Sequence, residues 1–121
     1  MTKNWSKACK LGEKHGFQTV NIIQPILGTS DRIISQDELR IMNQKEFKNQ
    51  YLTYLKNINI DYSKVISCNN IVDLRNSFGG MDGINIYFDE GHMTDFGYEI
   101  VADKITEKII PIIDEDLFEN R

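Results

Sequence analysis

Two residues in the carboxyl-terminal third of the chain have types and spacing that suit general-base catalysis. Asp89 stands three residues before His92, in a polar stretch that precedes a helical pattern. In serine hydrolysis the imidazole must hold one tautomer, and a carboxylate bonded to its Nδ1 side fixes the ring and stabilises the imidazolium. We therefore expect Asp89 to orient His92, and His92 to accept a proton. The Asp-x-x-His spacing is not specific by itself, because such pairs also arise by chance.

The same polar stretch admits metal binding as an alternative. Asp89, Glu90, His92 and Asp95 are ligand types for a divalent cation, since carboxylates suit hard cations and imidazole suits zinc or manganese. Only one histidine lies in this group, and Asp95 is also placed to cap a helix. Glu90 is most simply a solvated loop charge. A divalent-metal site at Asp89 and His92 is thus the less favoured interpretation, and no cofactor is expected.

The residues after His92 predict a final helix. Thr94 or Asp95 is placed to cap its first turn, and Pro111 with the acidic residues that follow is expected to end it. One face carries the apolar residues, which recur at helical spacing: Tyr98, Val101, Ala102, Ile105, Ile109 and Ile112. His92 is therefore expected to lie just before a helix N-terminus.

The amino-terminal part predicts a helix that leads into a strand. Residues 4–14 place apolar side chains among lysines at helical spacing, and Gly16 follows them. Residues 17–23 are rich in β-branched types and are stopped by Pro25, which indicates a buried strand. The order helix, then strand, favours an α/β fold.

A loop and a second helical segment are expected next. Residues 27–37 favour turns and would lie past the carboxyl end of the strand, where open α/β sheets bind ligands. Ser35 or Asp37 is placed to cap a long helix over residues 36–56. Two further strand candidates are residues 64–68 and 71–74, of which we favour the later.

Composition excludes several classes of protein. The 121 residues are 40% hydrophobic and 26% charged, with a net charge of -4, so we expect a globular chain that does not bind nucleic acid. No apolar run approaches the roughly 20 residues that a membrane span needs. Cys9 and Cys68 are isolated, with no metal-site or disulfide-framework spacing, so we interpret them as two small buried hydrophobic residues. The redox compartment and the cellular location stay open.

The residues around the Asp-His pair carry a family resemblance. Residues 86–105 read IYFDEGHMTDFGYEIVADKI, and they resemble the last motif block of the SGNH (GDSL-like) hydrolase superfamily. That block shows an aromatic residue, Asp, two variable residues, His, then Thr or Ser, a Gly about five positions past the His, and an Ile-Ala helix. Residues 23–28 and 72–78 also look like the segments that precede this block. The resemblance covers about residues 5–113.

The resemblance implies a flavodoxin-like three-layer α/β/α fold and ester hydrolysis. Asp89 and His92 would be the acid and base of a Ser-His-Asp triad that acts on a small-molecule, glycan or lipid ester. The family's nucleophile lies in a Gly-Asp-Ser motif, which this sequence lacks. Residues 28–31, Gly-Thr-Ser-Asp, have another order and follow a different strand, and Asn69-Asn70 lacks the Gly of the family's oxyanion-hole motif. No nucleophile is assigned, and Ser30 is kept only as a third option.

The strand count indicates that part of the fold is missing. Two or three strands do not cover a parallel sheet, and the strand over 17–23 would expose a long apolar edge. We therefore expect residues 1–121 to form one partial domain, incomplete at its amino-terminal side, and the isolated chain to be inactive. The alternative is a non-catalytic SGNH-like binding or assembly module, with an oligomeric partner covering the open edge of the sheet.

Overall fold

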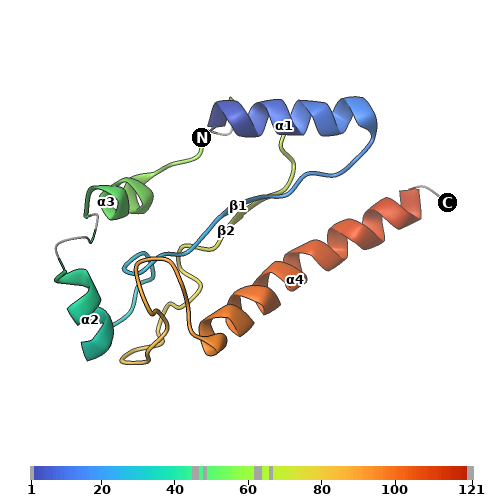
Figure 1. The fold of residues 1–121 in the computed structure, drawn as a ribbon. Helices are drawn as coiled ribbons and strands as arrows, with labels where there is room; N and C mark the ends of the chain where they lie inside the picture. The colour runs from blue at the N-terminus through green and yellow to red at the C-terminus, as the bar shows by residue number, and fades with distance from the viewer. Residues whose placement is uncertain (1, 45–46, 48, 62–63, 66, 120–121) are drawn as a thin grey trace. The chain divides into compact units, whose positions relative to one another are not determined.

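The computed structural model describes residues 2–44, 47, 49–61, 64–65 and 67–119, which form a small mixed α/β protein (Figure 1). The sheet has two strands within these residues. The elements follow in the order α1 (Thr2–His15), β1 (Asn21–Ile23), α2 (Gln36–Met42), α3 (Asn49–Asn57), β2 (Ile71–Asp73) and α4 (Asp95–Glu119). The predicted α/β class is confirmed at this level.

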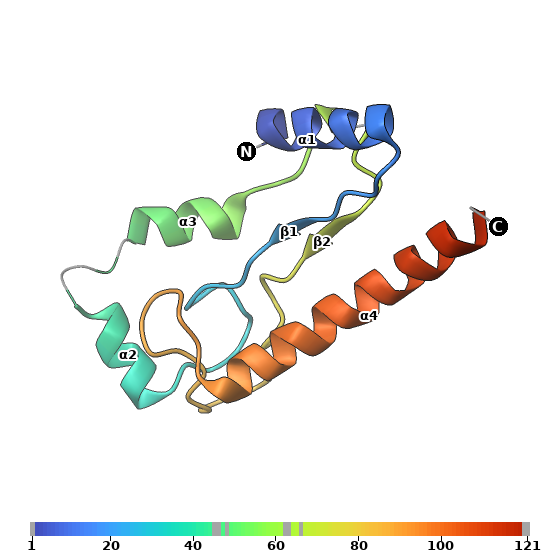
Figure 2. The ribbon, with the colours of Figure 1, turned by 45° about the vertical axis from the view of Figure 1, so that its right-hand side comes forward.

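The two strands pair in parallel and run side by side in both views (Figures 1 and 2). Ile22 lies opposite Val72, and the Asn21 N–H donates to the carbonyl of Asn70 at 2.9 Å. The predicted strand over 71–74 is confirmed over its first three residues, which form β2. The predicted strand over 17–23 was too long, because only its last three residues pair with β2.

The earlier strand candidate, residues 64–68, is not a strand where the structure describes it. Lys64 lies in a 3₁₀ turn, and the Cys68 N–H donates to the carbonyl of Val65 at 2.8 Å. That bond closes a turn, so the backbone of this segment is not extended. Ile66 lies outside the described residues.

The contacts divide the chain into two compact units. One comprises Met1–Ile23, Asn59–Asp73 and Thr106–Arg121, and the other comprises Gln24–Ile58 and Leu74–Ile105. The first holds α1, both strands and the end of α4. The second holds α2, α3, the start of α4 and both predicted site residues. That residues 1–121 form one partial domain stays a prediction.

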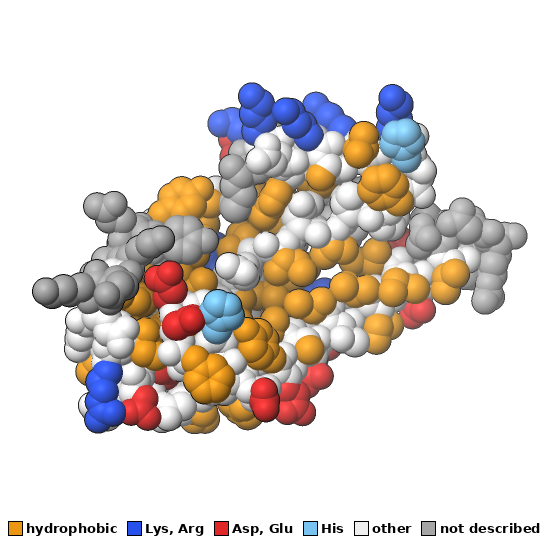
Figure 3. Space-filling model, viewed as in Figure 1, with side chains coloured by type: hydrophobic (Ala, Val, Ile, Leu, Met, Phe, Trp, Pro, Cys, Tyr) orange, Lys and Arg blue, Asp and Glu red, His pale blue; other side chains and the backbone are white. Residues whose placement is uncertain are grey.

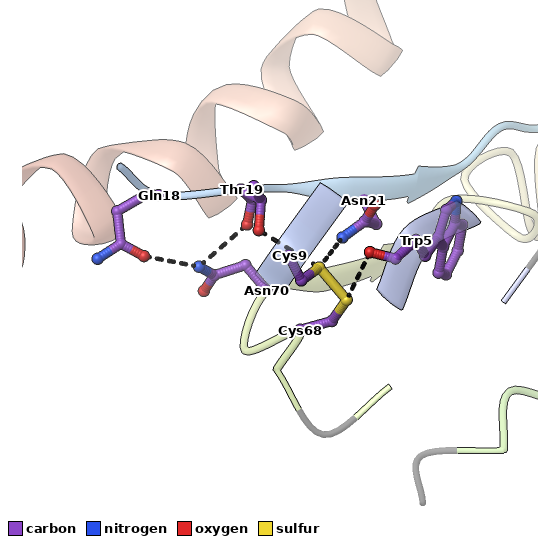
Figure 4. Close-up of a disulfide and its surroundings, with 7 residues drawn as sticks. All are labelled: Trp5, Cys9, Gln18, Thr19, Asn21, Cys68 and Asn70. Atoms are coloured by element: carbon purple, nitrogen blue, oxygen red, sulfur yellow. Dashed lines mark hydrogen bonds between the residues drawn. A yellow bond between two sulfur atoms is a disulfide. The ribbon is translucent and has the colours of Figure 1, made fainter. Parts of the chain in front are cut away.

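A disulfide between Cys9 and Cys68 lies in the core of the first unit (Figure 4). It joins residues 59 positions apart in the sequence, with their Cα atoms 5.2 Å apart. Thr19 Oγ1 and Asn21 Nδ2 donate to Cys9 Sγ at 3.4 Å and 3.1 Å. The interpretation of the cysteines as two separate hydrophobic residues was therefore wrong, although both are buried. No spacing rule could have found the pair, since the fold alone brings α1 to the segment before β2.

The outer face of α1 is basic. Lysines gather along it in the space-filling view (Figure 3), and all are exposed: Lys3, Lys7, Lys10 and Lys14. Their spacing of three or four residues places them on one side of the helix. The opposite side carries Cys9 and the disulfide, so α1 is amphipathic, as its sequence predicts.

The second unit has two buried clusters among the described residues: a smaller one of Ile26, Leu52 and Leu55, and a larger one around the segment before Asp89. The buried members of the larger cluster are Leu27, Phe78, Ile86, Tyr87 and Met93. The rings of Phe78 and Tyr87 pack edge to face, with centroids 5.7 Å apart. Burial raises the pKa of the Tyr87 hydroxyl, and within the described residues this hydroxyl has no hydrogen-bond partner. The residues on both sides of the polar turn thus contribute to this core.

The helix predicted over 36–56 is interrupted. Ser35 caps α2, as predicted, but α2 ends at Met42 and the described helix resumes as α3 at Asn49. Phe47 lies between them and packs against both buried clusters of this unit. Phe47 is partly buried, so tertiary packing at this position competes with the local preference for a continuous helix. Residues 45, 46 and 48 of the predicted helix lie outside the described part.

The final helix does not end at Pro111, contrary to the prediction. α4 continues through Pro111 to Glu119. A proline removes one helical hydrogen bond, that to the carbonyl four residues earlier. This carbonyl belongs to Glu107, an exposed residue, so water can hydrate it and the helix can continue. In the described residues no helix is long and apolar enough to cross a membrane.

Candidate functional site

A tight turn between two short backbone contacts carries Asp89 and His92. The Thr94 N–H donates to the carbonyl of Ile86 at 2.7 Å, and the Phe88 N–H donates to the carbonyl of His92 at 2.8 Å. Between these bonds, Tyr87 and Met93 form an isolated antiparallel bridge. These contacts therefore hold the two sides of the turn together where it meets the site residues.

Asp89 binds His92 through both of its carboxylate oxygens. Oδ1 accepts the backbone N–H of His92 at 2.7 Å and that of Gly91 at 2.9 Å. Oδ2 lies 2.8 Å from Nδ1 of the His92 ring. The structure therefore brings together the two residues that the sequence singled out. A spacing of three residues allows one carboxylate to reach both the backbone and the ring of the same histidine.

The Asp89 carboxylate favours one tautomer of His92. Two backbone N–H donors hold the pKa of Asp89 below its usual value. The N–H of His92 has the largest effect, and the N–H of Gly91 has the next largest. An ionised carboxylate only accepts hydrogen bonds, so the hydrogen of the neutral ring is placed on Nδ1. Nε2 then keeps its lone pair. The pair thus has the arrangement that a general base requires.

The pair is open to solvent. The side chain of His92 is 77% exposed and that of Asp89 is 54% exposed. A histidine and acidic side chains lie next to each other on the surface in Figure 3. Solvent weakens charge interactions at such a surface, so the short contacts, more than burial, hold the two side chains together.

Thr94 fixes where α4 begins relative to the pair. Its Oγ1 accepts the Gly97 N–H at 3.3 Å, and its carbonyl accepts the Tyr98 N–H at 3.0 Å. Thr94 is therefore the cap, and Asp95 is the exposed first residue of the helix. The prediction that His92 precedes a helix N-terminus is confirmed.

A pocket of about 180 Å³ adjoins the carboxylate of Asp89. Its wall combines apolar and polar side chains, contributed by Ile41, Gln44, Phe47, Asp89 and Glu90. The Leu27 N–H donates to the carbonyl of Glu90 at 2.9 Å and fixes this side of the turn. Glu90 is thus partly a wall residue, where the sequence indicated only a loop charge.

The hydroxyl of Ser30 is occupied by structural hydrogen bonds. It donates to the carbonyl of Arg75 at 2.9 Å and accepts the Phe78 N–H at 3.2 Å. These bonds connect the loop after Pro25 with the turn after β2. The structure therefore gives Ser30 a role in holding loops together, and shows no contact between it and His92.

The candidate metal ligands Asp89, Glu90, His92 and Asp95 do not form a metal cluster in the described part of the chain. Nowhere among the described residues do three or more histidine, cysteine, aspartate or glutamate side chains gather where a metal ion could bind. Asp89 and His92 bind each other instead.

The sequence missed a buried ion pair close to the site. Arg32 and Glu38 lie 2.5 Å apart, with side chains 2% and 0% exposed. The spacing Ser35-x-x-Glu38 is a capping-box pattern, and the structure shows both bonds of that box. The sequence therefore indicates the capping box. It indicates neither the burial of Glu38 nor its pairing with Arg32.

Comparison of the chain with models of protein families, with curated proteins and with solved structures found no match.

Proposed function

We propose that the chain provides the His-Asp half of a serine esterase or acyl hydrolase of the SGNH type, on a flavodoxin-like three-layer α/β/α fold. The observation that carries the proposal is the 2.8 Å contact between Asp89 Oδ2 and His92 Nδ1. This contact leaves Nε2 as the basic atom, in a sequence block that resembles the corresponding block of those hydrolases. The mixed α/β arrangement with parallel strands is compatible with such a fold.

The proposed chemistry follows from this geometry. His92 Nε2 accepts the proton of a serine hydroxyl as its oxygen attacks the ester carbonyl, and Asp89 stabilises the imidazolium that forms. The imidazolium then gives the proton to the departing alcohol, which leaves an acyl-serine. Water deprotonated by the same nitrogen hydrolyses that intermediate and restores the serine. No cofactor takes part.

The nucleophilic serine is not among the motifs that we identify in these 121 residues. The chain has no Gly-Asp-Ser, and the hydroxyl of Ser30 already makes two hydrogen bonds to backbone groups. We propose that the pocket beside Asp89 and Glu90 takes part of the ester substrate. We propose a small-molecule, glycan or lipid ester as the substrate class.

Labelling with a fluorophosphonate tests the function, because this probe reacts covalently with activated serines. The natural protein that contains these residues is treated with the probe in extracts of its source cells. We expect labelling that His92→Ala lowers by roughly three orders of magnitude or more and Asp89→Asn lowers less. His15→Ala is the matched control, since His15 is the only other histidine and lies exposed at the end of α1. Equal labelling of wild type and His92→Ala would contradict the proposal.

The second candidate is a non-catalytic module of the same fold that binds or assembles with a partner. The use of the Ser30 hydroxyl in loop packing favours it, together with the missing nucleophile motif. The same experiment separates the two candidates. A folded natural protein that the probe does not label would favour the module.

A further inference from the structure

Among the residues whose burial the structure describes, Glu38 is the most deeply buried charged residue that the proposed chemistry leaves unused. Its side chain is 0% exposed, and it stands in the first turn of α2. Oε1 accepts the Ser35 N–H at 3.3 Å, and Ser35 Oγ accepts the Glu38 N–H at 3.2 Å. Burial of a carboxylate is costly unless every oxygen is paired. Capping α2 uses only Oε1, so the contacts of the other oxygen show what else this carboxylate does.

The other oxygen of Glu38 contacts the segment that leads to Asp89. Oε2 lies within hydrogen-bond distance of the N–H groups of Ile86, at 3.4 Å, and Tyr87, at 3.3 Å. It also receives Arg32 Nη2 at 2.5 Å. Ile86 and Tyr87 are buried and belong to no named strand. Buried N–H groups need acceptors, and here a carboxylate takes the place of a neighbouring strand.

Arg32 extends the same set of bonds. Its Nη1 donates to the carbonyls of Ile84, at 3.1 Å, and Met81, at 3.4 Å. The ion pair therefore binds the backbone of residues 81–87 at four groups, two carbonyls and two N–H groups. Asp89 follows only two residues after the last of them.

We propose that Glu38 and Arg32 are positioning residues that fix the turn carrying Asp89 and His92. This inference rests on the proposed function for the role that it gives to the turn. The contacts of Glu38 and Arg32 do not depend on that function. The Ile86–Thr94 and Phe88–His92 bonds join the two sides of the turn and are internal to it, and the Leu27–Glu90 bond ties its tip to the loop after Pro25. Three hydrogen bonds also join the segment before the turn to residues 33–37: Gly83 N–H to the Ile33 carbonyl, Ile33 N–H to Asp82 Oδ1, and Asn85 Nδ2 to Asp37 Oδ2. Among the links to residues 32–38, the ion pair is the buried one, and it alone contacts the backbone of Ile86 and Tyr87. Without the pair, Ile86 and Tyr87 lose their acceptor, and the approach of the Asp89 carboxylate to the ring becomes less fixed.

The test measures the Asp89–His92 contact itself. Nitrogen-15 shifts of the His92 ring report the fraction of neutral rings with the hydrogen on Nδ1. In Glu38→Gln we expect the ratio of Nδ1–H to Nε2–H tautomers to fall roughly tenfold, the effect of losing one hydrogen bond to a charged group. The control is Leu52→Ala, which removes a buried side chain of the same unit that makes none of these contacts. It should lower stability and leave the tautomer ratio unchanged.

A second variant tests the proposal if Glu38→Gln does not fold. Arg32→Lys keeps a positive charge beside Glu38 but lacks the fork that reaches two carbonyls, and it should lower the tautomer ratio to a smaller extent. Unchanged ratios in folded Glu38→Gln and Arg32→Lys would overturn the proposal. Unfolding in both variants would also overturn it, because the pair would then support the whole unit. The measurement needs no esterase activity, so its failure differs from a failure of fluorophosphonate labelling.

Discussion

Asp89 Oδ1 accepts two backbone N–H groups of its own turn, while Oδ2 contacts the ring of His92 at 2.8 Å. One carboxylate thus fixes both the backbone that carries the histidine and the ring itself. Any change that neutralises this carboxylate loosens the turn and the ring together. Protonation of Asp89 should therefore change both the stability of the fold and the geometry of the site.

Stability should fall in acid through Asp89. Backbone donors lower its pKa in the folded chain below the ordinary value of 3.8, so ionised Asp89 stabilises the fold. This contribution is fully present above the unfolded-state pKa, begins to fall near it, and is gone once the pH passes below the folded-state pKa. Urea unfolding of wild type and Asp89→Asn at several pH values should show a stability gap that closes in acid.

Asp103→Asn is the control for removing one carboxylate from the chain. Asp103 is an exposed residue of α4. A gap between wild type and Asp89→Asn that stays constant with pH would show that the backbone bonds do not depend on the charge.

Gly97 should not tolerate a methyl group. A Cβ there would lie 2.9 Å from Ile86 Cγ2, 3.0 Å from Met93 Cβ and 3.1 Å from the Ile86 carbonyl oxygen. Two of these atoms are backbone or Cβ atoms that cannot rotate away. We expect Gly97→Ala to lower the free energy of unfolding by about 1–3 kcal/mol, although alanine favours helices.

Gly91→Ala is the matched control for this effect. A Cβ at Gly91 would meet nothing within 4 Å. Its effect on the free energy of unfolding should stay within about 0.5 kcal/mol. Chemical denaturation of both variants decides the matter, and equal losses would show that the start of α4 is not closely packed against Ile86.

Reduction should destabilise the first unit. The Cys9–Cys68 bond closes a loop of 59 residues and lies buried in the core of that unit. We expect its loss to cost about 2–4 kcal/mol, seen as a lower Tm after dithiothreitol treatment. In Cys9→Ser with Cys68→Ser, dithiothreitol should change nothing. A Tm of the wild type that is insensitive to reductant would contradict the bridge.

The purified 121-residue chain should not hydrolyse p-nitrophenyl acetate by a triad. His92 has its orienting carboxylate, but the sequence offers no Gly-Asp-Ser and the Ser30 hydroxyl is engaged. His92→Ala and His15→Ala should therefore show equal rates, since each removes one exposed imidazole. A rate that disappears in His92→Ala alone would overturn this expectation.

The features that the sequence predicted well depend on neighbours in the chain. Asp89 and His92 are three residues apart, Thr94 caps the helix that begins at the next residue, and Ser35 caps α2 in the same way. In each case the backbone between the partners is short, so residue type and spacing limit the geometry. The amphipathic pattern of α1 is local for the same reason.

The features that only the tertiary structure decided join distant segments. Cys9 meets Cys68, Ser30 bonds to Arg75 and Phe78, and Glu38 bonds to Ile86 and Tyr87. The break between α2 and α3, and the passage of α4 through Pro111, likewise override local preference. Periodicity and spacing describe a single element and its ends. Which buried donor meets which acceptor depends on how the elements pack, so the sequence determined the Asp-His pair and the fold determined what holds it in place.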